Sequence, residues 1–188
     1  MTQPQVDAPL TWNVAGLLAD DPGASREFDV SDVTIPLDDD LELARPISGH
    51  VRLRRTNRGI IADARLQSAL RAECSRCLRP MEVAVDLKIE EEFLPALDLA
   101  TGKPLPADAE PDVARLTDHH EVDLEPLVRD ELVLAEPIAP LHSPDCAGLC
   151  IECGLPLDEG THDHPTDDID PRLEALKAFR VDEGGETG

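Results

Sequence analysis

The sequence predicts an α+β fold in which an antiparallel β-meander or open barrel carries a few short helices and a zinc-knuckle region. Three observations lead to this prediction. Apolar and polar residues alternate over three consecutive segments, which is the pattern of strands with one buried face. Short turn-forming stretches join these segments, so that neighbouring strands pair antiparallel. All five cysteines fall in two short clusters whose spacing is typical of metal-binding turns.

The 188-residue chain is expected to form one main domain with appendages. The expected parts are an N-terminal docking segment (1–27), an antiparallel sheet with the first cysteine pair (28–94), an acidic flexible loop (95–121), a part with a helix, the second cysteine cluster and a C-terminal helix (122–180), and a disordered tail (181–188). The sheet and the part over 122–180 belong to one domain.

The strands are predicted from the period-2 pattern of apolar residues. It is weak over 28–37 and clear over 47–55, 60–74 and 81–89. The stretch 56–59, with asparagine and glycine, predicts a hairpin turn because both residues accept positive φ. The first cysteine pair falls between the last two strands and therefore lies at one tip of the meander.

Two stretches outside the sheet predict helices. Apolar residues recur at helical spacing over 124–136, where Asp123 suits the N-terminus and Pro137 ends the pattern. A second amphipathic helix is expected after Pro171, with Leu173 and Phe179 on its apolar side. Within 1–27, four apolar residues are expected in a short helix or strand that packs on the main body: Trp12, Val14, Leu17 and Leu18.

The charge and composition exclude several classes of protein. The net charge of −23 makes the molecule as a whole repel nucleic acid and acidic membranes. Neither a secretory signal nor an apolar run of membrane-spanning length is present, so we expect a cytoplasmic protein with reduced cysteines.

The cysteine clusters predict structural zinc. Cys74 and Cys77 form one Cys-x-x-Cys pair, Cys150 and Cys153 form another, and Cys146 lies just upstream. An odd number of cysteines fits a disulfide scheme poorly, and a redox motif would place one such pair at the start of a helix. Two thiolates on each of two tight turns instead suit a tetrahedral zinc ion whose positions are all filled by protein.

Two ligand sets remain open. The favoured set combines Cys74, Cys77, Cys150 and Cys153 in one site and leaves Cys146 free. The alternative set has two sites, one with Cys150, Cys153, His162 and His164, and one with Cys74, Cys77 and Cys146, to which His142 can be added as a fourth ligand. The reserve ligands for this alternative are Cys146, His142, His162 and His164. It uses every cysteine but requires two metal ions in a small region.

A basic island interrupts the acidic chain. Residues 51–80 contain eight arginines and only two acidic residues. A guanidinium group suits phosphate, so the island is a candidate RNA-contact surface. The alternative is that these arginines pair with the protein's own acids. The candidates for RNA contact are Arg52, Arg54, Arg55, Arg58, Arg76 and Arg79.

Four segments carry a distinctive pattern: 73–78 and 146–154 with their cysteines, 123–142 with its Pro-Ile-Ala-Pro run, and 170–176. Together they resemble the YceD-like family of large-ribosomal-RNA accumulation factors. The resemblance implies a bacterial cytoplasmic protein that supports 23S rRNA levels and has no established catalytic activity. Many family members have a Cys-x-Cys motif where this chain has His162 and His164, and histidine is an equally good zinc ligand.

The sequence bears on three classes of function. The favoured one is a non-enzymatic ribosome-biogenesis factor with structural zinc, whose partner is 23S rRNA or a large-subunit precursor particle. The alternative is an acidic module that mimics RNA and holds a basic ribosomal protein before assembly. An enzyme is disfavoured because the sequence lacks a nucleophile elbow and a phosphate-binding glycine loop, and neither a membrane nor a small-molecule substrate is expected.

Overall fold

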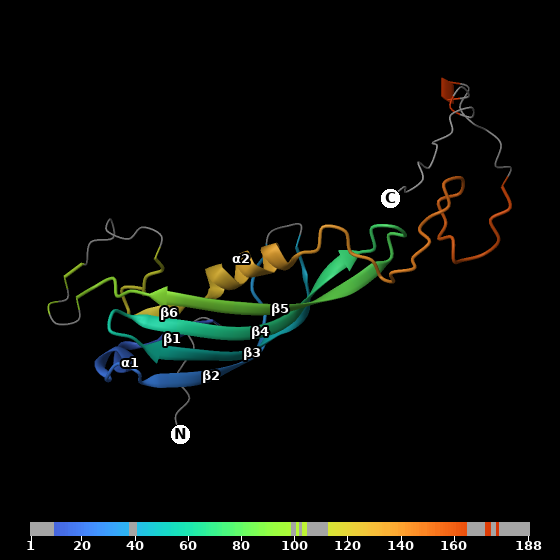
Figure 1. Ribbon diagram of the computed structural model, residues 1–188. Helices are drawn as coiled ribbons and strands as arrows, with labels where there is room; N and C mark the ends of the chain where they lie inside the picture. The colour runs from blue at the N-terminus through green and yellow to red at the C-terminus, as the bar shows by residue number, and fades with distance from the viewer. Residues whose placement is uncertain are drawn as a thin grey trace, which may run out of the picture.

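The computed structural model describes residues 10–37, 41–98, 101, 103–104, 113–164, 172–173 and 176. A long four-stranded sheet occupies one end of an elongated molecule, and the loops that carry the cysteines form a lobe at the other end (Figure 1). The sheet is an antiparallel meander in the order β2-β3-β4-β5. Its strands are β2 (Ser25–Val33), β3 (Leu43–Arg55), β4 (Ile60–Glu73) and β5 (Pro80–Phe93).

The observed fold confirms the α+β class and the meander, but not the open barrel. β2 and β5 lie at the two edges of the described sheet and do not pair with each other. The strand predicted over 28–37 instead spans Ser25–Val33, and its pairing with β3 shifts register between Val30 and Val33. The other three predicted strands form, and β3 and β5 are longer than the alternating pattern indicates.

The hairpin turn between β3 and β4 depends on Gly59. The N–H group of Thr56 donates to the carbonyl oxygen of Gly59 at 2.9 Å, and the N–H group of Gly59 donates to the hydroxyl oxygen of Thr56 at 2.9 Å, so the Thr56 side chain helps to close the turn. A β-carbon on Gly59 would lie 2.1 Å from the carbonyl oxygen of Phe93, which no side chain tolerates. From this turn, β4 and β5 pair without a register shift from Ile60 with Phe93 to Glu73 with Pro80. This unbroken ladder places the segment 74–79 at the far tip of the hairpin.

The N-terminal segment forms both a strand and a helix against the main body. β1 (Thr11–Asn13) pairs with β6 (Glu121–Asp123), and α1 (Ala15–Ala19) follows directly. The ring of Trp12 lies 5.7 Å from that of Phe28 on β2. The four apolar residues singled out in this segment are all buried.

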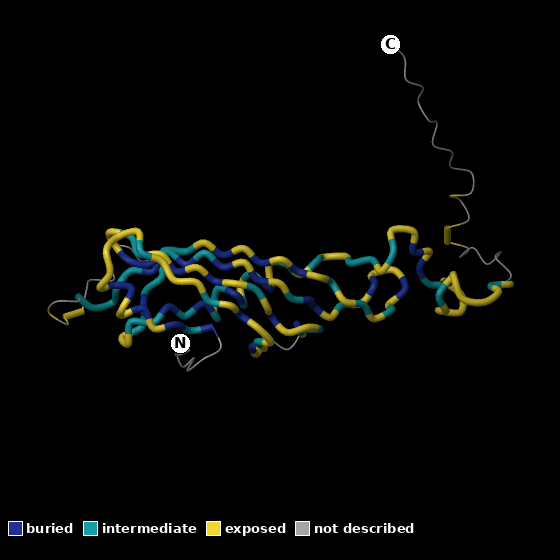
Figure 2. The backbone as a smooth tube through the Cα atoms, turned by 90° about the horizontal axis from the view of Figure 1, so that it is seen from below, coloured by how far each residue is buried: buried dark blue, intermediate teal, exposed yellow. Residues whose placement is uncertain are grey.

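The helix α2 (Glu125–Ala135) lies alongside β5 (Figure 1). Asp123 accepts a hydrogen bond from the N–H group of Glu125 at 3.0 Å, so it satisfies one donor at the start of the helix. Val128 and Leu132 are buried. The main core thus lies between one face of the sheet and the elements α1 and α2, and buried and exposed residues alternate along the strands (Figure 2).

Several predictions fall outside the described residues. They include the C-terminal helix apart from three residues, the tail 181–188, and residues 105–112 of the acidic loop. The two ends of the 95–121 segment are held, because Leu94 exchanges backbone hydrogen bonds of 2.9 Å with Ala114 and Leu116. Among the described elements, no helix is long and apolar enough to cross a membrane.

Candidate metal centre

The first cysteine pair lies on a tight turn at the tip of the β4–β5 hairpin. The N–H group of Cys74 donates to the carbonyl oxygen of Arg79, and that of Leu78 donates back to the carbonyl oxygen of Cys74, both at 2.9 Å. Leu78 has a φ of 57°, a conformation that glycine adopts more readily. The turn therefore places Cys74 and Cys77 side by side, as a zinc knuckle requires.

The second cysteine pair has the same backbone pattern. The N–H group of Cys150 donates to the carbonyl oxygen of Leu155, and that of Gly154 donates to the carbonyl oxygen of Cys150, both at 2.8 Å. Gly154 has a φ of 71°, as expected of the glycine that follows Cys153. The chain thus contains two turns of one kind that are far apart in the sequence.

The first turn and a distant loop bring four candidate ligands together. One ligand atom from each of Cys74, Cys77, His142 and Cys146 lies within 4.8 Å of all the others. The sulfur of Cys74 is 3.7 Å from that of Cys146, and the sulfur of Cys77 is 3.3 Å from Nδ1 of His142. We call these four residues the inner quartet.

A second group forms within the C-terminal loop. Ligand atoms of Cys150, Cys153, His162 and His164 also lie within 4.8 Å of one another. The sulfur of Cys153 is 3.5 Å from Nδ1 of His162, and Nε2 of His162 lies 3.0 Å from the carbonyl oxygen of Pro156. A hydrogen bond to the second ring nitrogen is how proteins orient a histidine ligand. We call these four residues the outer quartet.

The distances within both quartets fit a tetrahedral metal. In a zinc tetrahedron with Zn–S bonds of ~2.3 Å and Zn–N bonds of ~2.0 Å, two sulfur ligands are ~3.8 Å apart, and a sulfur and an imidazole nitrogen are ~3.5 Å apart. The observed separations of 3.7, 3.3 and 3.5 Å are close to these edges. All five cysteines are free thiols rather than disulfides. The donor sets, Cys₃His and Cys₂His₂, are both common for structural zinc.

The two quartets differ in burial. Cys74, Cys77 and Cys146 are buried and form a small second core with Met81, Leu141 and Leu149, separate from the main core. In the outer quartet, Cys150 is buried, Cys153 is exposed and the histidines are half-buried. The inner quartet thus occupies the place of a hydrophobic core in a lobe where Ile151, Leu155 and Leu157 stay exposed.

The environment of the inner quartet favours a thiolate at Cys74. Burial disfavours the charged form, but hydrogen bonds from the backbone and side chain of His142 and from the N–H groups of Arg76 and Cys77 outweigh it. Together they lower the pKa of Cys74 to about 5. A thiolate is the form of cysteine that binds a metal.

The remaining cysteines respond to their own surroundings. Burial raises the pKa of Cys146, and the neighbouring sulfurs of Cys77 and Cys74 act in the same direction. The backbone N–H groups of Cys153 and Glu152 lower the pKa of Cys150. Each quartet therefore contains one thiol that is already predisposed to ionise.

Polar contacts hold the C-terminal loop to the first turn. Arg79 donates to Asp158 through two nitrogens at 2.6 and 2.7 Å and to Glu159 at 2.6 Å. The guanidinium group lowers the pKa of the Asp158 carboxyl group. Arg76 donates to the carbonyl oxygen of Cys146 at 2.9 Å. Arg79 thus links the first turn to the loop of the outer quartet, and Arg76 links it to Cys146 within the inner quartet.

The structure brings together each predicted cysteine pair, but groups the pairs differently from the favoured ligand set. Cys74 and Cys77 gather with His142 and Cys146, whereas Cys150 and Cys153 gather with the two later histidines. This arrangement corresponds to the alternative that was left open. Spacing alone identifies the pairs, but only the folded chain shows which loop faces which pair. The identity of the ligands stays a prediction.

Most of the arginines that are candidates for RNA contact have partners within the protein. Arg52 lies 3.4 Å from Glu27, and Arg55 donates to backbone oxygens of Leu18 and Gly59. The exposed side chain of Arg54 has no hydrogen bond or ion pair within the described ranges. Arg58 is exposed. Arg76 and Arg79 are the two arginines that bond the segment after α2 and the C-terminal loop.

Residues 62–180 match the family described as "Large ribosomal RNA subunit accumulation protein YceD". The chain belongs to the YceD family. The matched region begins within β4 and includes all eight residues of the two quartets.

Relatives in mycobacteria extend the similarity over almost the whole chain. Two proteins described as uncharacterised, from Mycobacterium tuberculosis and Mycobacterium bovis, are each 33% identical over 180 residues, covering 93% of this chain and 83% of the relative. A Mycobacterium leprae protein is 30% identical over 133 residues, covering 70% of this chain and 58% of its own. No solved structure matches.

Proposed function

We propose that this YceD-family protein is a non-enzymatic factor in the biogenesis of the large ribosomal subunit and supports the accumulation of 23S rRNA. Membership of the family supports this function, because the family is described by large-ribosomal-RNA accumulation. The candidate site also supports it. Both quartets offer four protein ligands, which suits a structural metal rather than a catalytic one with an open position.

In this proposal the quartets hold zinc. The inner quartet would fasten the tip of the β4–β5 hairpin to the segment after α2, and the outer quartet would fold the C-terminal loop. When bound, zinc supplies cross-links and keeps the thiols ionised. The spacing of the ligand atoms carries this part of the proposal.

The expected partner is 23S rRNA or a precursor particle of the large subunit. Arg54 and the neighbouring Arg52 are exposed on β3, where they could approach phosphates. The molecule carries a net charge of −23, so long-range repulsion opposes binding to naked RNA. Binding to a particle that also presents basic protein should therefore be stronger than binding to isolated 23S rRNA.

Depletion of the protein from its bacterium tests the proposal. The ratio of 23S to 16S rRNA should fall, and tagged protein should sediment with large-subunit precursors. A normal rRNA ratio together with absence from those particles would refute the proposed function. For direct RNA contact, replacing Arg52 and Arg54 by alanine should reduce the salt dependence of particle binding by about one to two units of log–log slope.

The alternative function is an acidic module that holds a basic ribosomal protein. The ion pairs of the basic island favour it, because Arg52, Arg71 and Arg79 are each engaged by a carboxylate of this chain. Fewer cations then remain for RNA, while the acidic surface remains available to a basic partner.

A further inference from the structure

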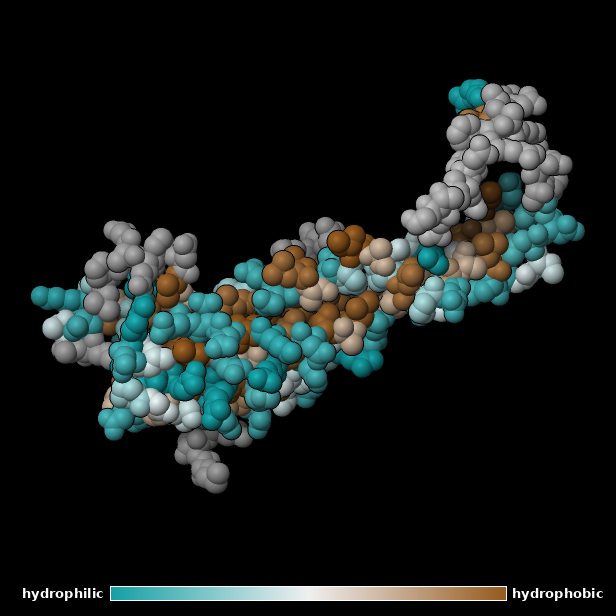
Figure 3. Space-filling model, in the orientation of Figure 1, coloured by the Kyte–Doolittle hydropathy of each residue, from teal (hydrophilic) through white to brown (hydrophobic). Residues whose placement is uncertain are grey.

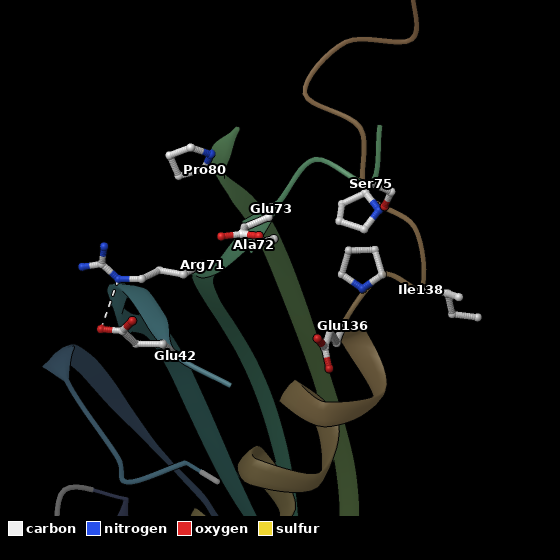
Figure 4. A pocket seen from close by; sticks show the side chains of 10 residues that line it. Glu42, Arg71, Ala72, Glu73, Ser75, Pro80, Glu136 and Ile138 are labelled. Atoms are coloured by element: carbon white, nitrogen blue, oxygen red, sulfur yellow. Dashed lines mark ion pairs between the residues drawn. The ribbon is translucent and has the colours of Figure 1, made fainter. Parts of the chain in front are cut away.

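A groove lies where the sheet meets the cysteine lobe. It encloses about 580 Å³ between the end of β4, the start of β5 and the segment that follows α2. Figure 4 shows Glu73 near its centre, the pair of Arg71 and Glu42 on one side, and Glu136 and Ile138 on the other. None of the residues that line it belongs to either quartet.

The groove carries negative charge that the protein does not neutralise. Arg71 is occupied by Glu42, with Nε 3.2 Å from the carboxylate. Glu73 and Glu136 are exposed, and neither carboxylate has a hydrogen bond or ion pair with the part of the chain that is described. Two free carboxylates, one near the centre of the groove and one on its side, repel phosphate and attract a cation.

The same groove has an apolar rim. Ile138 is fully exposed, and Leu134, on the outer side of α2, is 77% exposed. Pro137 and Pro140 line the groove between these residues and the first turn. Hydrophobic side chains gather along α2 and the segment that follows it (Figure 3). Exposed apolar side chains next to a groove are typical of a surface that binds another chain.

We propose that this groove binds an extended, arginine- or lysine-rich segment of a partner protein. Basic side chains of the segment would pair with Glu73 and Glu136, and an apolar side chain would pack on Ile138. Charge complementarity selects this occupant over RNA, because every unpaired charged group that lines the groove is an acid. The inference rests on the proposed function, for which it specifies how a basic protein of the particle is held.

The inner quartet lies where the two walls of the groove meet. One wall ends in the first cysteine turn and the other leads to His142. The N–H group of Ser75 joins the walls by donating to the carbonyl oxygen of Pro140 at 2.8 Å. Cys77 and His142 meet just beyond this hydrogen bond, at 3.3 Å. Removal of the metal from these ligands should therefore weaken binding in the groove.

Peptide binding to the full chain tests the proposal. The probe is a short fluorescent peptide of alternating arginine and leucine, and binding is followed by anisotropy and by amide shifts in NMR. The double change Glu73→Gln with Glu136→Gln should weaken binding by roughly three- to tenfold, the value expected for two exposed ion pairs. Ile138→Ser should weaken it further.

A matched control separates the groove from general charge. Asp29→Asn with Glu90→Gln removes the same charge from exposed positions on the sheet and should leave the affinity unchanged. Equal weakening by both double changes, or amide shifts that fall outside the groove, would overturn the proposal. Stronger binding of a uridine oligonucleotide than of the peptide at the groove would also overturn it.

Failure of the groove proposal can be distinguished from failure of the proposed function. If the Glu73→Gln and Glu136→Gln protein keeps its place on precursor particles and binds the peptide normally, the groove proposal fails while the function stands. If the wild-type protein binds the peptide in the groove but never sediments with the particles, the groove proposal stands and the proposed function fails.

Discussion

The sulfur of Cys74 lies 3.7 Å from the sulfur of Cys146, although the two cysteines are 72 residues apart in the chain. The separation is too long for a disulfide bond, which is ~2.05 Å, and is close to the edge of a zinc–thiolate tetrahedron. The contact joins the tip of the β4–β5 hairpin to the segment after α2. A metal at this point would thus connect the sheet to the C-terminal lobe.

The first prediction concerns the number of zinc ions. Purified reduced protein should contain two per chain, because each quartet supplies four ligand atoms within 4.8 Å. Cys146→Ser should remove one ion and leave the outer one in place. Cys153→Ser should remove the other ion. Elemental analysis by mass spectrometry, with protein concentration from amino-acid analysis, measures each content.

The four-cysteine set gives a different result in the same experiment. It requires one zinc ion, which Cys146→Ser leaves in place and Cys150→Ser removes. One zinc ion per wild-type chain together with an unaffected Cys146→Ser protein would therefore rule out the two quartets. Zinc-free protein from chelator-free buffers would rule out both sets.

The sheet could be predicted from the sequence because its pattern is local. Alternation over 60–74 and 81–89 identifies β4 and β5, and the turn at Gly59 fixes which strands are adjacent. The pairing of β1 with β6 could not be predicted, since three-residue strands more than 100 residues apart leave no periodic signal. Closure into a barrel depends on how the edge strands twist and what covers them, which alternation does not encode.

The candidate metal centre was predictable only in its local parts. Spacing identifies Cys74 with Cys77 and Cys150 with Cys153, because each pair lies on one turn. The other half of each quartet comes from loops, and the favoured set joined the two cysteine pairs instead of adding His142 and Cys146 to the first. The position of the loop with His142 and Cys146 depends on α2 and on the hydrogen bond of Pro140 to the first turn, and thus on the tertiary structure, whereas His162 and His164 lie in the same C-terminal loop as the second cysteine pair.

The second prediction is that the two quartets contribute unequally to stability. Loss of the inner metal by Cys77→Ser should lower the free energy of unfolding by several kcal/mol, on the order expected when binding is coupled to folding. The buried sulfurs of this quartet form the core of the lobe. Cys153→Ser should have a smaller effect, because Cys153 is exposed. Urea unfolding followed by circular dichroism measures both.

The control for this prediction is the same pair of variants without metal. In excess chelator, the wild-type protein and both variants should unfold at nearly the same urea concentration. A difference that persists after chelation would mean that packing of the thiols, rather than metal binding, stabilises the lobe. If the two variants lose equal free energy of unfolding in the presence of zinc, the two quartets do not contribute unequally and the prediction is wrong.

The third prediction concerns the backbone of the two turns. Leu78 and Gly154 occupy the same place in their turns, with φ values of 57° and 71°. Gly154→Ala should destabilise the second turn by about 1 kcal/mol, because residues with a β-carbon disfavour this conformation. Nothing lies near enough to the position to clash. Leu78→Gly should instead stabilise the first turn, by up to about 1 kcal/mol. The greater conformational freedom of glycine in the unfolded chain reduces this gain.

Thermal unfolding of the zinc-loaded proteins shows whether Gly154→Ala lowers stability and Leu78→Gly raises it. Gly23→Ala provides a control, because Gly23 also has a positive φ and open space but lies far from the quartets, before β2. It should lower stability without changing the zinc affinity. If Leu78→Gly destabilises the protein, the packing of the leucine side chain outweighs backbone strain and the interpretation is wrong.

The fourth prediction is that Arg79 holds the C-terminal loop in place. Its guanidinium group bonds Asp158 and Glu159 at 2.6–2.7 Å, so one side chain fixes the loop to the first turn. Arg79→Ala should increase hydrogen exchange at the amides of residues 150–164 and leave β3 to β5 protected, because the sheet has its own ladder. Exchange measured by mass spectrometry locates the change.

Arg54→Ala is the matched control, since it removes an exposed arginine that has no side-chain partner within the described ranges. It should leave the exchange of residues 150–164 unchanged. Arg79→Lys should recover only part of the protection, because an ammonium group cannot form the paired bonds of a guanidinium group with Asp158. If Arg79→Ala leaves the loop protected, the outer quartet alone orders it, and removal of zinc should then be the change that exposes these amides.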